Sequence, residues 1–447
     1  MTPNAPASLA SPALLWAPQA WLDGRWQPQV LLEVAPDGRW ARVQAHQPCP
    51  PAEEATVQVL PGPVLPGLVN AHSHAFQRAF VGLAERREGA HDDFWSWRDR
   101  MYGVALRLSP DALREVATHL YRELLAGGFT QVCEFHYLHH DTDGTPYGDP
   151  LAMAWALAEA AQATGIGLTL LPVVYERAGF AAAGLRPDQR RFACTGAQAL
   201  AMAEALRAAR RPGVTAGVAM HSLRAATPAS IRAVAEQAGD VPLHIHVAEQ
   251  TAEIDDCLQH TGRRPVQWLA AEGLLDVRWH LVHATHTTPA EIEAVARAGA
   301  GVVLCPGTEA NLGDGLPDLP GWLAAGVPWT VGTDSHVTRT WPDELRWLEY
   351  GQRLVLRRRN VAADPEGGQP ATAARLFHAA AGGSAAAAGV PGLGRLAAGA
   401  RADLLVLHTD DAALHGVPHD HALDAVVFAS PTRPFRAVMV AGRWVSL

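Results

Sequence analysis

The chain contains no lysine, so all 36 of its basic side chains apart from histidine are arginine. This absence excludes Schiff-base catalysis by a lysine and phosphate binding by a P-loop lysine. It also excludes a two-metal site bridged by a carbamylated lysine. Any catalytic chemistry in this protein must therefore use other side chains or a cofactor.

Cysteine and long apolar runs are scarce as well. No apolar run reaches the length of a transmembrane helix, and the first arginine is Arg25, so we expect no secretory signal peptide. A net charge of −9 indicates neither a nucleic-acid partner nor an anionic membrane partner. Five scattered cysteines without CxxC spacing predict reduced thiols in a cytoplasmic protein. They are Cys49, Cys133, Cys194, Cys257 and Cys305.

The composition, 48% hydrophobic and 18% charged, is typical of a globular protein with a large core. Both ends of the chain contain short β-type runs broken by proline, glycine and aspartate. We expect residues 1–62 and 391–447 to pair into one small β-sandwich domain, with residues 63–390 forming a larger domain between them. The β-type runs are 19–22, 30–34, 55–60, 402–407, 425–428 and 436–445.

Strands and helices alternate in the larger domain. Ser109-Pro110, Thr227-Pro228 and Thr288-Pro289 each combine an N-cap residue with proline at the first helical position. Continuous apolar runs between the helices predict strands that are covered on both faces. Eight such runs predict a (β/α)8 barrel, and the alanine-rich stretch 371–388 predicts a surface helix. The eight runs are 64–71, 129–135, 167–175, 215–220, 242–247, 279–282, 301–304 and 329–331.

Polar residues suited to metal binding and proton transfer follow six of these strands. His72 and His74 lie two residues apart at the end of the first strand, so their side chains share one face. With 21 histidines in the chain, such a pair alone also fits two ordinary polar residues. Barrel enzymes place their active sites at the C-terminal ends of the strands. Because six of these ends carry residues suited to metal binding or proton transfer, a catalytic site is favoured. The other residues at these ends include Glu134, His136, Tyr137, His221, Arg224, His244, His246, Glu249, His283, His286 and Asp334.

Four motifs in strand order resemble the metal-site signatures of the amidohydrolase superfamily. They are Pro66-Gly67-Leu68-Val69-Asn70-Ala71-His72-Ser73-His74, His246-Val247-Ala248-Glu249, Leu281-Val282-His283 and Gly332-Thr333-Asp334-Ser335. The resemblance implies that His72, His74, His246 and Asp334 hold one Zn²⁺ per subunit, with Fe²⁺ as the alternative ion. The missing lysine favours a single metal ion.

The same resemblance implies catalytic roles for three residues. Asp334 accepts a proton from the activated water, and His283 orients the nucleophile and stabilises charge in the tetrahedral intermediate. Glu249 carries a proton to the substrate nitrogen and then to departing ammonia. A carboxylate that merely stabilises a helix N-terminus is the alternative interpretation of Glu249.

We expect residues 74–79, 134–139, 220–224 and 305–315 to lie near the substrate, and these segments resemble the N-formimidoyl-L-glutamate deiminase family of bacterial histidine degradation. Its substrate has two carboxylates, which calls for arginines, since a guanidinium binds a carboxylate through two hydrogen bonds. We expect Arg98, in a loop after the first strand, and Arg224 in this role, with Arg78 and Arg100 as substitutes. Gln77, Tyr137 and His221 complete the expected substrate contacts. For His136, His139, His140, His244, His286 and Cys305 we expect packing or structural roles.

We therefore expect a cytoplasmic, homodimeric zinc hydrolase that converts N-formimidoyl-L-glutamate and water to N-formyl-L-glutamate and ammonia. One alternative is another mononuclear aminohydrolase of the superfamily, acting on a purine, pyrimidine or triazine. Such a flat ring would need an aromatic clamp and amide donors in place of two arginines. A catalytically silent barrel that acts as a scaffold is the alternative of a different class.

Overall fold

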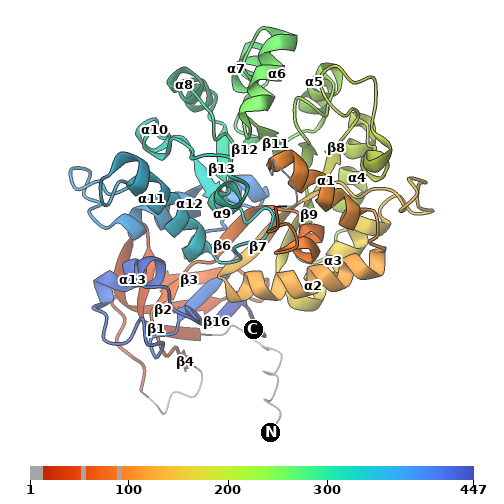
Figure 1. Cartoon of the computed structure of the whole chain (residues 1–447). Coiled ribbons are helices and arrows are strands. Elements are labelled where there is room, and N and C mark those ends of the chain that lie inside the picture. The colour runs from red at the N-terminus through yellow and green to blue at the C-terminus, as the bar shows by residue number, and fades with distance from the viewer. Residues whose placement is uncertain (1–13, 52–56, 88–92) are drawn as a thin grey trace.

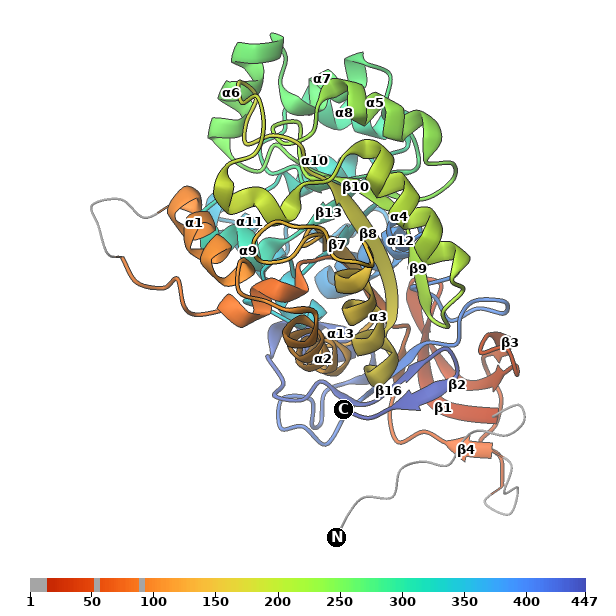
Figure 2. The same ribbon diagram turned by 90° about the vertical axis from the view of Figure 1, so that its right-hand side faces the viewer.

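The computed structural model describes residues 14–51, 57–87 and 93–447, whose strands form two separate sheets (Figures 1 and 2). The middle of the chain forms a parallel sheet surrounded by helices, and both ends of the chain contribute to the second sheet. Each sheet has its own cluster of buried hydrophobic residues. The predicted (β/α)8 barrel with a small β domain is confirmed.

The second sheet brings together strands from residues 14–65 and 404–445. Its strand order is β17-β16-β15-β5-β1-β2-β3, with β4 paired to β1. Five of the six predicted β-type runs overlap these strands, although Ala55 and Thr56 lie outside the described residues. The run 425–428 was predicted wrongly, because it belongs to helix α13 (Ala422–Phe428). The strands are β1 (Leu14–Leu22), β2 (Arg25–Val34), β3 (Trp40–Gln44), β4 (Val57–Val59), β5 (Val64–Leu65), β15 (Leu404–Leu407), β16 (Phe435–Val440) and β17 (Arg443–Val445).

The barrel strands follow one another around the sheet in chain order. All eight runs predicted for the barrel form strands, but Val64 and Leu65 of the first run pair in the other sheet as β5. The fourth run is divided into β9 and β10 at Gly217. In order, the strands are β6 (Leu68–Ser73), β7 (Phe129–His136), β8 (Gly167–Val174), β9 (Val214–Ala216), β10 (Val218–Met220), β11 (Leu243–Val247), β12 (Trp279–His283), β13 (Gly301–Leu304) and β14 (Trp329–Val331).

The barrel closes between its first and last strands through a single parallel bridge, Ser73 to Asp334. The backbone amide of Asp334 donates to the carbonyl of His72 at 2.9 Å, and the amide of His74 donates to the carbonyl of Asp334 at 3.3 Å. Glycine is required just before this bridge, because a Cβ on Gly332 would lie 2.6 Å from the Cβ of His72. Closure of the barrel therefore fixes three of the expected metal ligands relative to one another.

Helices surround the barrel, and several begin where the sequence predicts. The side chains of Ser109, Thr227 and Thr288 each accept a hydrogen bond from a backbone amide in the first turn of the helix that follows. In the described ranges no helix has both the length and the hydropathy to span a bilayer. The helices are η1 (Ala75–Phe80), α1 (Phe94–Ala105), α2 (Pro110–Ala126), α3 (Ala152–Thr164), η2 (Pro187–Phe192), α4 (Gly196–Ala208), α5 (Pro228–Gln237), α6 (Thr251–Thr261), α7 (Pro265–Ala271), α8 (Pro289–Ala298), α9 (Pro306–Leu312), α10 (Leu319–Ala324), α11 (Trp341–Leu356), α12 (Thr372–Ala388), η3 (His419–His421) and α13.

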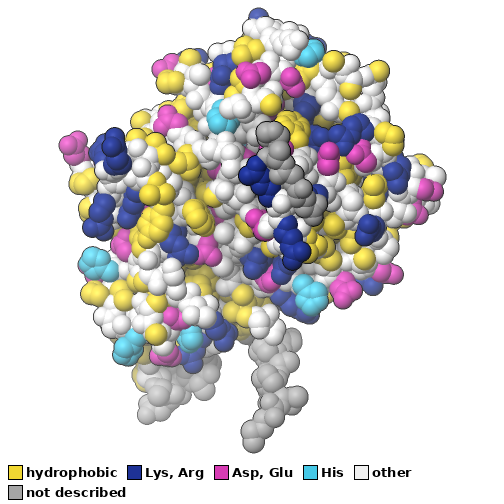
Figure 3. All heavy atoms as spheres, viewed as in Figure 1, with side chains coloured by type: hydrophobic (Ala, Val, Ile, Leu, Met, Phe, Trp, Pro, Cys, Tyr) yellow, Lys and Arg dark blue, Asp and Glu magenta, His cyan; other side chains and the backbone are white. Residues whose placement is uncertain are grey.

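Helix α12 is alanine-rich as predicted, but it is largely buried and is not a surface helix. Its last carbonyls, which no helical amide can reach, accept hydrogen bonds from side chains of barrel strands. His244 Nε2 lies 2.9 Å from the carbonyl of Ala387, and Thr169 donates to the carbonyl of Ala388 at 2.8 Å. His244 thus stabilises the fold, as the sequence predicts. By contrast, α11 leaves apolar side chains on the surface (Figure 3). Leu354 of this helix is 77% exposed.

Candidate metal centre and active site

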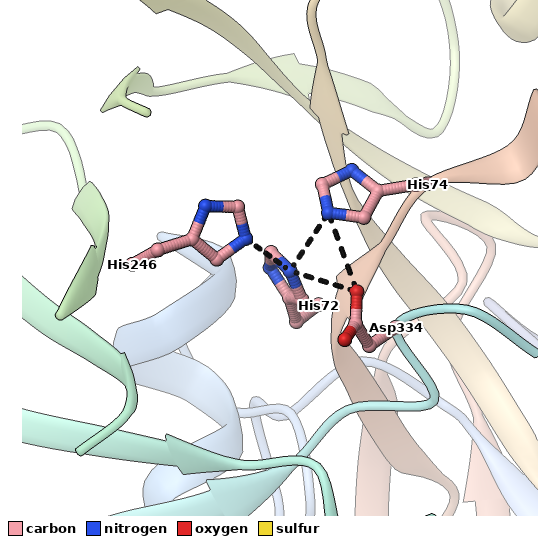
Figure 4. A group of neighbouring side chains, drawn as sticks. All are labelled: His72, His74, His246 and Asp334. Carbon is pink, nitrogen blue, oxygen red and sulfur yellow. Dashed lines mark hydrogen bonds and ion pairs between the residues drawn. The ribbon is translucent and has the colours of Figure 1, made fainter. Parts of the chain in front are cut away.

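Four donor groups from strands that are far apart in the sequence converge at the C-terminal end of the barrel (Figure 4). His72 Nε2 lies 3.1 Å from His74 Nε2, 2.9 Å from His246 Nε2 and 3.4 Å from Asp334 Oδ1. His74 Nε2 lies 3.3 Å from the same carboxylate oxygen. Four ligands bound tetrahedrally to a zinc ion would be spaced by about 3.3 Å. This geometry fits one metal ion held by three imidazoles and one carboxylate.

Backbone carbonyls orient two of these imidazoles for metal binding. His74 Nδ1 lies 3.0 Å from the carbonyl of Phe135, and His246 Nδ1 lies 2.9 Å from the carbonyl of His221. A carbonyl can only accept a hydrogen bond, so each Nδ1 carries the proton and each Nε2 presents its lone pair. Metal-binding histidines usually have this arrangement.

The protonation states in this cluster also favour a cation. Burial lowers the pKa of His72 to about 3, and it lowers the pKa values of His74 and His246 as well. Burial opposes ionisation of Asp334, but the hydrogen bond with His72 and the neighbouring imidazoles leave the pKa of Asp334 below its usual value. At neutral pH the site therefore offers neutral imidazoles and a carboxylate.

The backbone is strained around these residues. Asp334 and His283 have φ angles of 46° and 69°, and Ala248, Ala284 and His336 are also left-handed. Residues other than glycine rarely adopt this conformation, and it tends to occur at functional sites. Here it turns the chain sharply just beyond the ends of β11, β12 and β14.

Glu134 braces the segment that contains His74, a function that the sequence does not reveal. Its carboxylate accepts a hydrogen bond from the Ser73 hydroxyl at 2.7 Å and one from the Ala75 amide at 2.5 Å. Both neighbours of His74 are therefore held by one buried side chain. The only sequence signal was the position of Glu134 at the end of the second barrel strand.

Two further predicted catalytic residues, His283 and Glu249, lie beside the four donors, which include the third, Asp334. His283 Nε2 is 3.7 Å from Glu249 Oε1 and 3.8 Å from Asp334 Oδ2. On its other side, His283 Nδ1 lies 3.4 Å from a carboxylate oxygen of Glu309, which sequence reasoning did not single out. Burial raises the pKa of Glu249 to about 7. Cys305 is a buried thiol, as predicted, although its sulfur also lies close to His283 and Asp334.

Arg98 and Arg224 lie over the same indole ring. Their guanidinium carbons are 4.7 Å and 5.3 Å from the ring centre of Trp95, respectively. Arg98 and Trp95 belong to helix α1 and not to a loop, which corrects the prediction. Asp93 and Ser96 form the capping box that starts this helix. A correct prediction of this helix would have placed Trp95 and Arg98 on the same face of it, because they are three residues apart.

Both guanidiniums retain donors for a ligand. Among the described residues, Arg224 Nη1 and Arg98 Nε are buried and have no hydrogen-bond partner. The ion pair of Arg98 with Asp99 is long, at 3.4 Å. Buried donors that lack a partner are rare in proteins and commonly mark a ligand position.

The other expected substrate contacts lie close to the metal cluster. The Gln77 amide donates to the Tyr137 hydroxyl at 3.2 Å, and Gln77 Oε1 has no partner within the described ranges. The ring centre of Tyr137 lies 5.1 Å from that of His74 and 5.7 Å from that of His221. Tyr137 thus lies between a predicted metal ligand and His221, with Gln77 hydrogen-bonded to it.

The remaining candidates have structural partners. Arg78 is ion-paired with Glu123 through two hydrogen bonds, and Arg100 donates to the carbonyl of Ala84. His139, His140 and His286 each lie within 3.1 Å of a backbone carbonyl, as expected for structural histidines. His136 is buried and packs against His139.

Comparisons with known proteins show the family of the chain. The Amidohydrolase family model matches residues 64–445. The chain is 47% identical to formimidoylglutamate deiminase of Pseudomonas aeruginosa, with 96% of this chain and 94% of that protein covered. It is 31% identical to 8-oxoguanine deaminase of the same species, with coverage of 92% and 88%. An amidohydrolase structure from Brucella melitensis matches with a TM-score of 0.89 and 41% identity, covering 96% of this chain and 94% of that one. The chain therefore belongs to the amidohydrolase family.

Proposed function

We propose that this protein hydrolyses N-formimidoyl-L-glutamate to N-formyl-L-glutamate and ammonia, a step of histidine degradation. The observation that carries this proposal is the pair of guanidiniums over Trp95, each with a buried nitrogen that lacks a partner among the described residues, together with a cluster suited to one metal ion. A dicarboxylate substrate with a hydrolysable C–N bond suits both parts. The 47% identity to a formimidoylglutamate deiminase supports the same substrate.

The proposed metal ligands are His72, His74, His246 and Asp334. Three imidazoles and one carboxylate suit a single Zn²⁺, and Fe²⁺ is the alternative. The chemistry such an ion supplies is the activation of water for attack at neutral pH. The chain has no lysine to bridge a second ion of the carbamate-linked type.

The chain's own residues would complete the reaction. Asp334 takes the proton released when water adds to the formimidoyl carbon. His283, which lies within 3.8 Å of both Glu249 and Asp334, donates a hydrogen bond to the attacking oxygen. Glu249 passes the proton taken by Asp334, and then the proton of the new hydroxyl, to the terminal nitrogen. The C–N bond breaks, and ammonia leaves while the carbonyl of the formyl group forms. Water and the amidine are thus converted to a formamide and ammonia.

Arg98 and Arg224 would bind the carboxylates of the substrate, assisted by Gln77, Tyr137 and His221. Replacement of Arg224 by alanine should raise KM about 10- to 100-fold with little change in kcat, because a hydrogen bond to a charged group contributes about 1.5–3 kcal/mol. Steady-state kinetics measure this effect. Arg232→Ala is the control, since Arg232 pairs with Glu272 on the surface. An unchanged KM in Arg224→Ala would remove Arg224 from the substrate site.

An ammonia-release assay tests the function directly. We expect rapid release from N-formimidoyl-L-glutamate, slower release from N-formimidoyl-L-aspartate, and none from 8-oxoguanine or adenosine derivatives. Metal content is measured on the same sample. Release from a purine alone would support the alternative aminohydrolase, and a metal-free, inactive protein would support the scaffold hypothesis.

Location and assembly are separate predictions. We infer a cytoplasmic homodimer that has neither a nucleic-acid nor a membrane partner. Light scattering coupled to size-exclusion chromatography tests the dimer, and a monomer at micromolar concentration would contradict it.

A further inference from the structure

Charged side chains near the site form two groups. Arg98 and Arg224 lie over Trp95. Glu249 and Asp314 form the other group, near His283, where burial and the carboxyl of Glu249 raise the pKa of Asp314. The arginines have an assigned ligand in the proposed function, whereas Asp314 has none.

The backbone around Asp314 is tightly held. Helix α9 ends at Gly313, whose φ of 71° reverses the chain. The amide of Asp314 then donates to the carbonyl of Glu309 at 3.0 Å, and the carbonyl of Asp314 accepts from His286 Nε2 at 2.8 Å. The carboxyl group of Asp314 is therefore presented from a rigid turn.

One oxygen of this carboxyl group is free. Oδ1 accepts a hydrogen bond from the side-chain amide of Gln250, the residue that follows Glu249. Oδ2 is buried and has no partner within the described ranges. Asp314 as a whole is only 5% exposed, so water has little access to this oxygen. An unpaired buried carboxylate is costly unless a ligand or a cation satisfies it.

The electrostatics around Asp314 indicate a missing positive charge. Burial and the nearby Glu249 raise the pKa of Asp314 to about 9. A cation placed between the two buried carboxyls would stabilise the ionised form of both.

From this arrangement, and resting on the proposed function, we infer that Asp314 and Glu249 form an acidic subsite that binds the formamidinium head of the substrate. Amidines are strong bases, so this head is a cation with N–H donors on both nitrogens. Glu249 takes the terminal nitrogen, and Asp314 Oδ2 accepts a hydrogen bond from the head group. The product has a neutral formyl head and lacks this charge. Asp314 thereby selects a basic amidine over a neutral ring and favours release of the product.

The variant Asp314→Asn tests this inference, because asparagine keeps an oxygen for Gln250 but cannot ionise when a cationic head binds. We expect kcat/KM for N-formimidoyl-L-glutamate to fall by about 10- to 100-fold, the range of a hydrogen bond to a charged group. The inhibition constant of N-formyl-L-glutamate should change by less than about twofold, since that ligand has no cationic head. Metal content and melting temperature should match those of the unmodified protein.

Glu344→Gln is the matched control. Glu344 is also a buried carboxyl, but its two oxygens already accept hydrogen bonds from Gly307 and Thr338. Any effect of this variant should be the same for substrate and product. Equal losses for both ligands in Asp314→Asn, or no loss, would overturn the inference and leave the proposed function intact. An unmodified protein that is inactive on N-formimidoyl-L-glutamate would reject the proposed function and the inference together.

Discussion

Replacing Glu249 by glutamine should leave a protein that binds its metal ion normally but turns over its substrate about a thousandfold more slowly. Glu249 lies 3.7 Å from His283 and is not among the four converging donors. With a pKa of about 7, its carboxyl group can both donate and accept a proton near neutral pH. Glutamine has nearly the same shape but cannot transfer a proton, and the loss of general acid–base catalysis typically costs about 10²–10⁴ in rate.

Single-turnover and steady-state ammonia release, with metal analysis of the same sample, measure this effect. Glu253→Gln is the matched control, because Glu253 is buried four residues further on and accepts a hydrogen bond from the Glu249 amide at 3.1 Å. We expect this variant to lose less than about tenfold in kcat. Normal turnover by Glu249→Gln would contradict the proton-transfer role.

Removal of the metal should abolish hydrolysis, and replacement of His246 should make that loss permanent. The ion would provide several kcal/mol of transition-state stabilisation, so kcat should fall by about 10⁴-fold or more after chelation. Added Zn²⁺ should restore activity to the unmodified protein but not to His246→Ala. The Nε2 atom of His246 lies 2.9 Å from that of His72, so its removal opens one side of the cluster.

His244→Gln is the informative control, because His244 lies two residues earlier on the same strand. It hydrogen-bonds to the carbonyl of Ala387 at the other end of the barrel. This variant should keep its metal and its activity, with a free energy of unfolding lower by about 1–2 kcal/mol. Metal analysis and chemical denaturation separate the two variants. Full metal binding by His246→Ala would exclude His246 as a ligand.

Much of the fold could be predicted because its signals are local. Continuous apolar runs predict the barrel strands, and Ser109, Thr227 and Thr288 mark helix starts through side chains that reach only three residues ahead. Where local signals are ambiguous, prediction failed. The run 425–428 contains two valines and a phenylalanine, which suit a strand, but it is helical in its tertiary setting.

Burial was harder to predict than secondary structure. The composition of α12 indicates a helix, yet its many alanines and few polar residues give no clear polar face to show which side meets water. Its position depends on His244 and Thr169, which lie on other elements and satisfy its last carbonyls. Helix α1 was missed because its tryptophans and arginines obscure the helical spacing of its buried residues, Phe94, Met101, Tyr102 and Ala105.

By itself, the sequence determined which residue types stand at each strand end and which chemistry the missing lysine excludes. Alternation along a strand and the common direction of parallel strands are properties of the local chain, so they can be derived from it. Only the tertiary structure decided that His72 and Asp334 are joined through the backbone where the barrel closes. It alone also placed Arg98 and Arg224 over one ring and left an oxygen of Asp314 buried and free. Contacts between residues so far apart in the chain depend on how the whole core packs, and no local pattern carries that information.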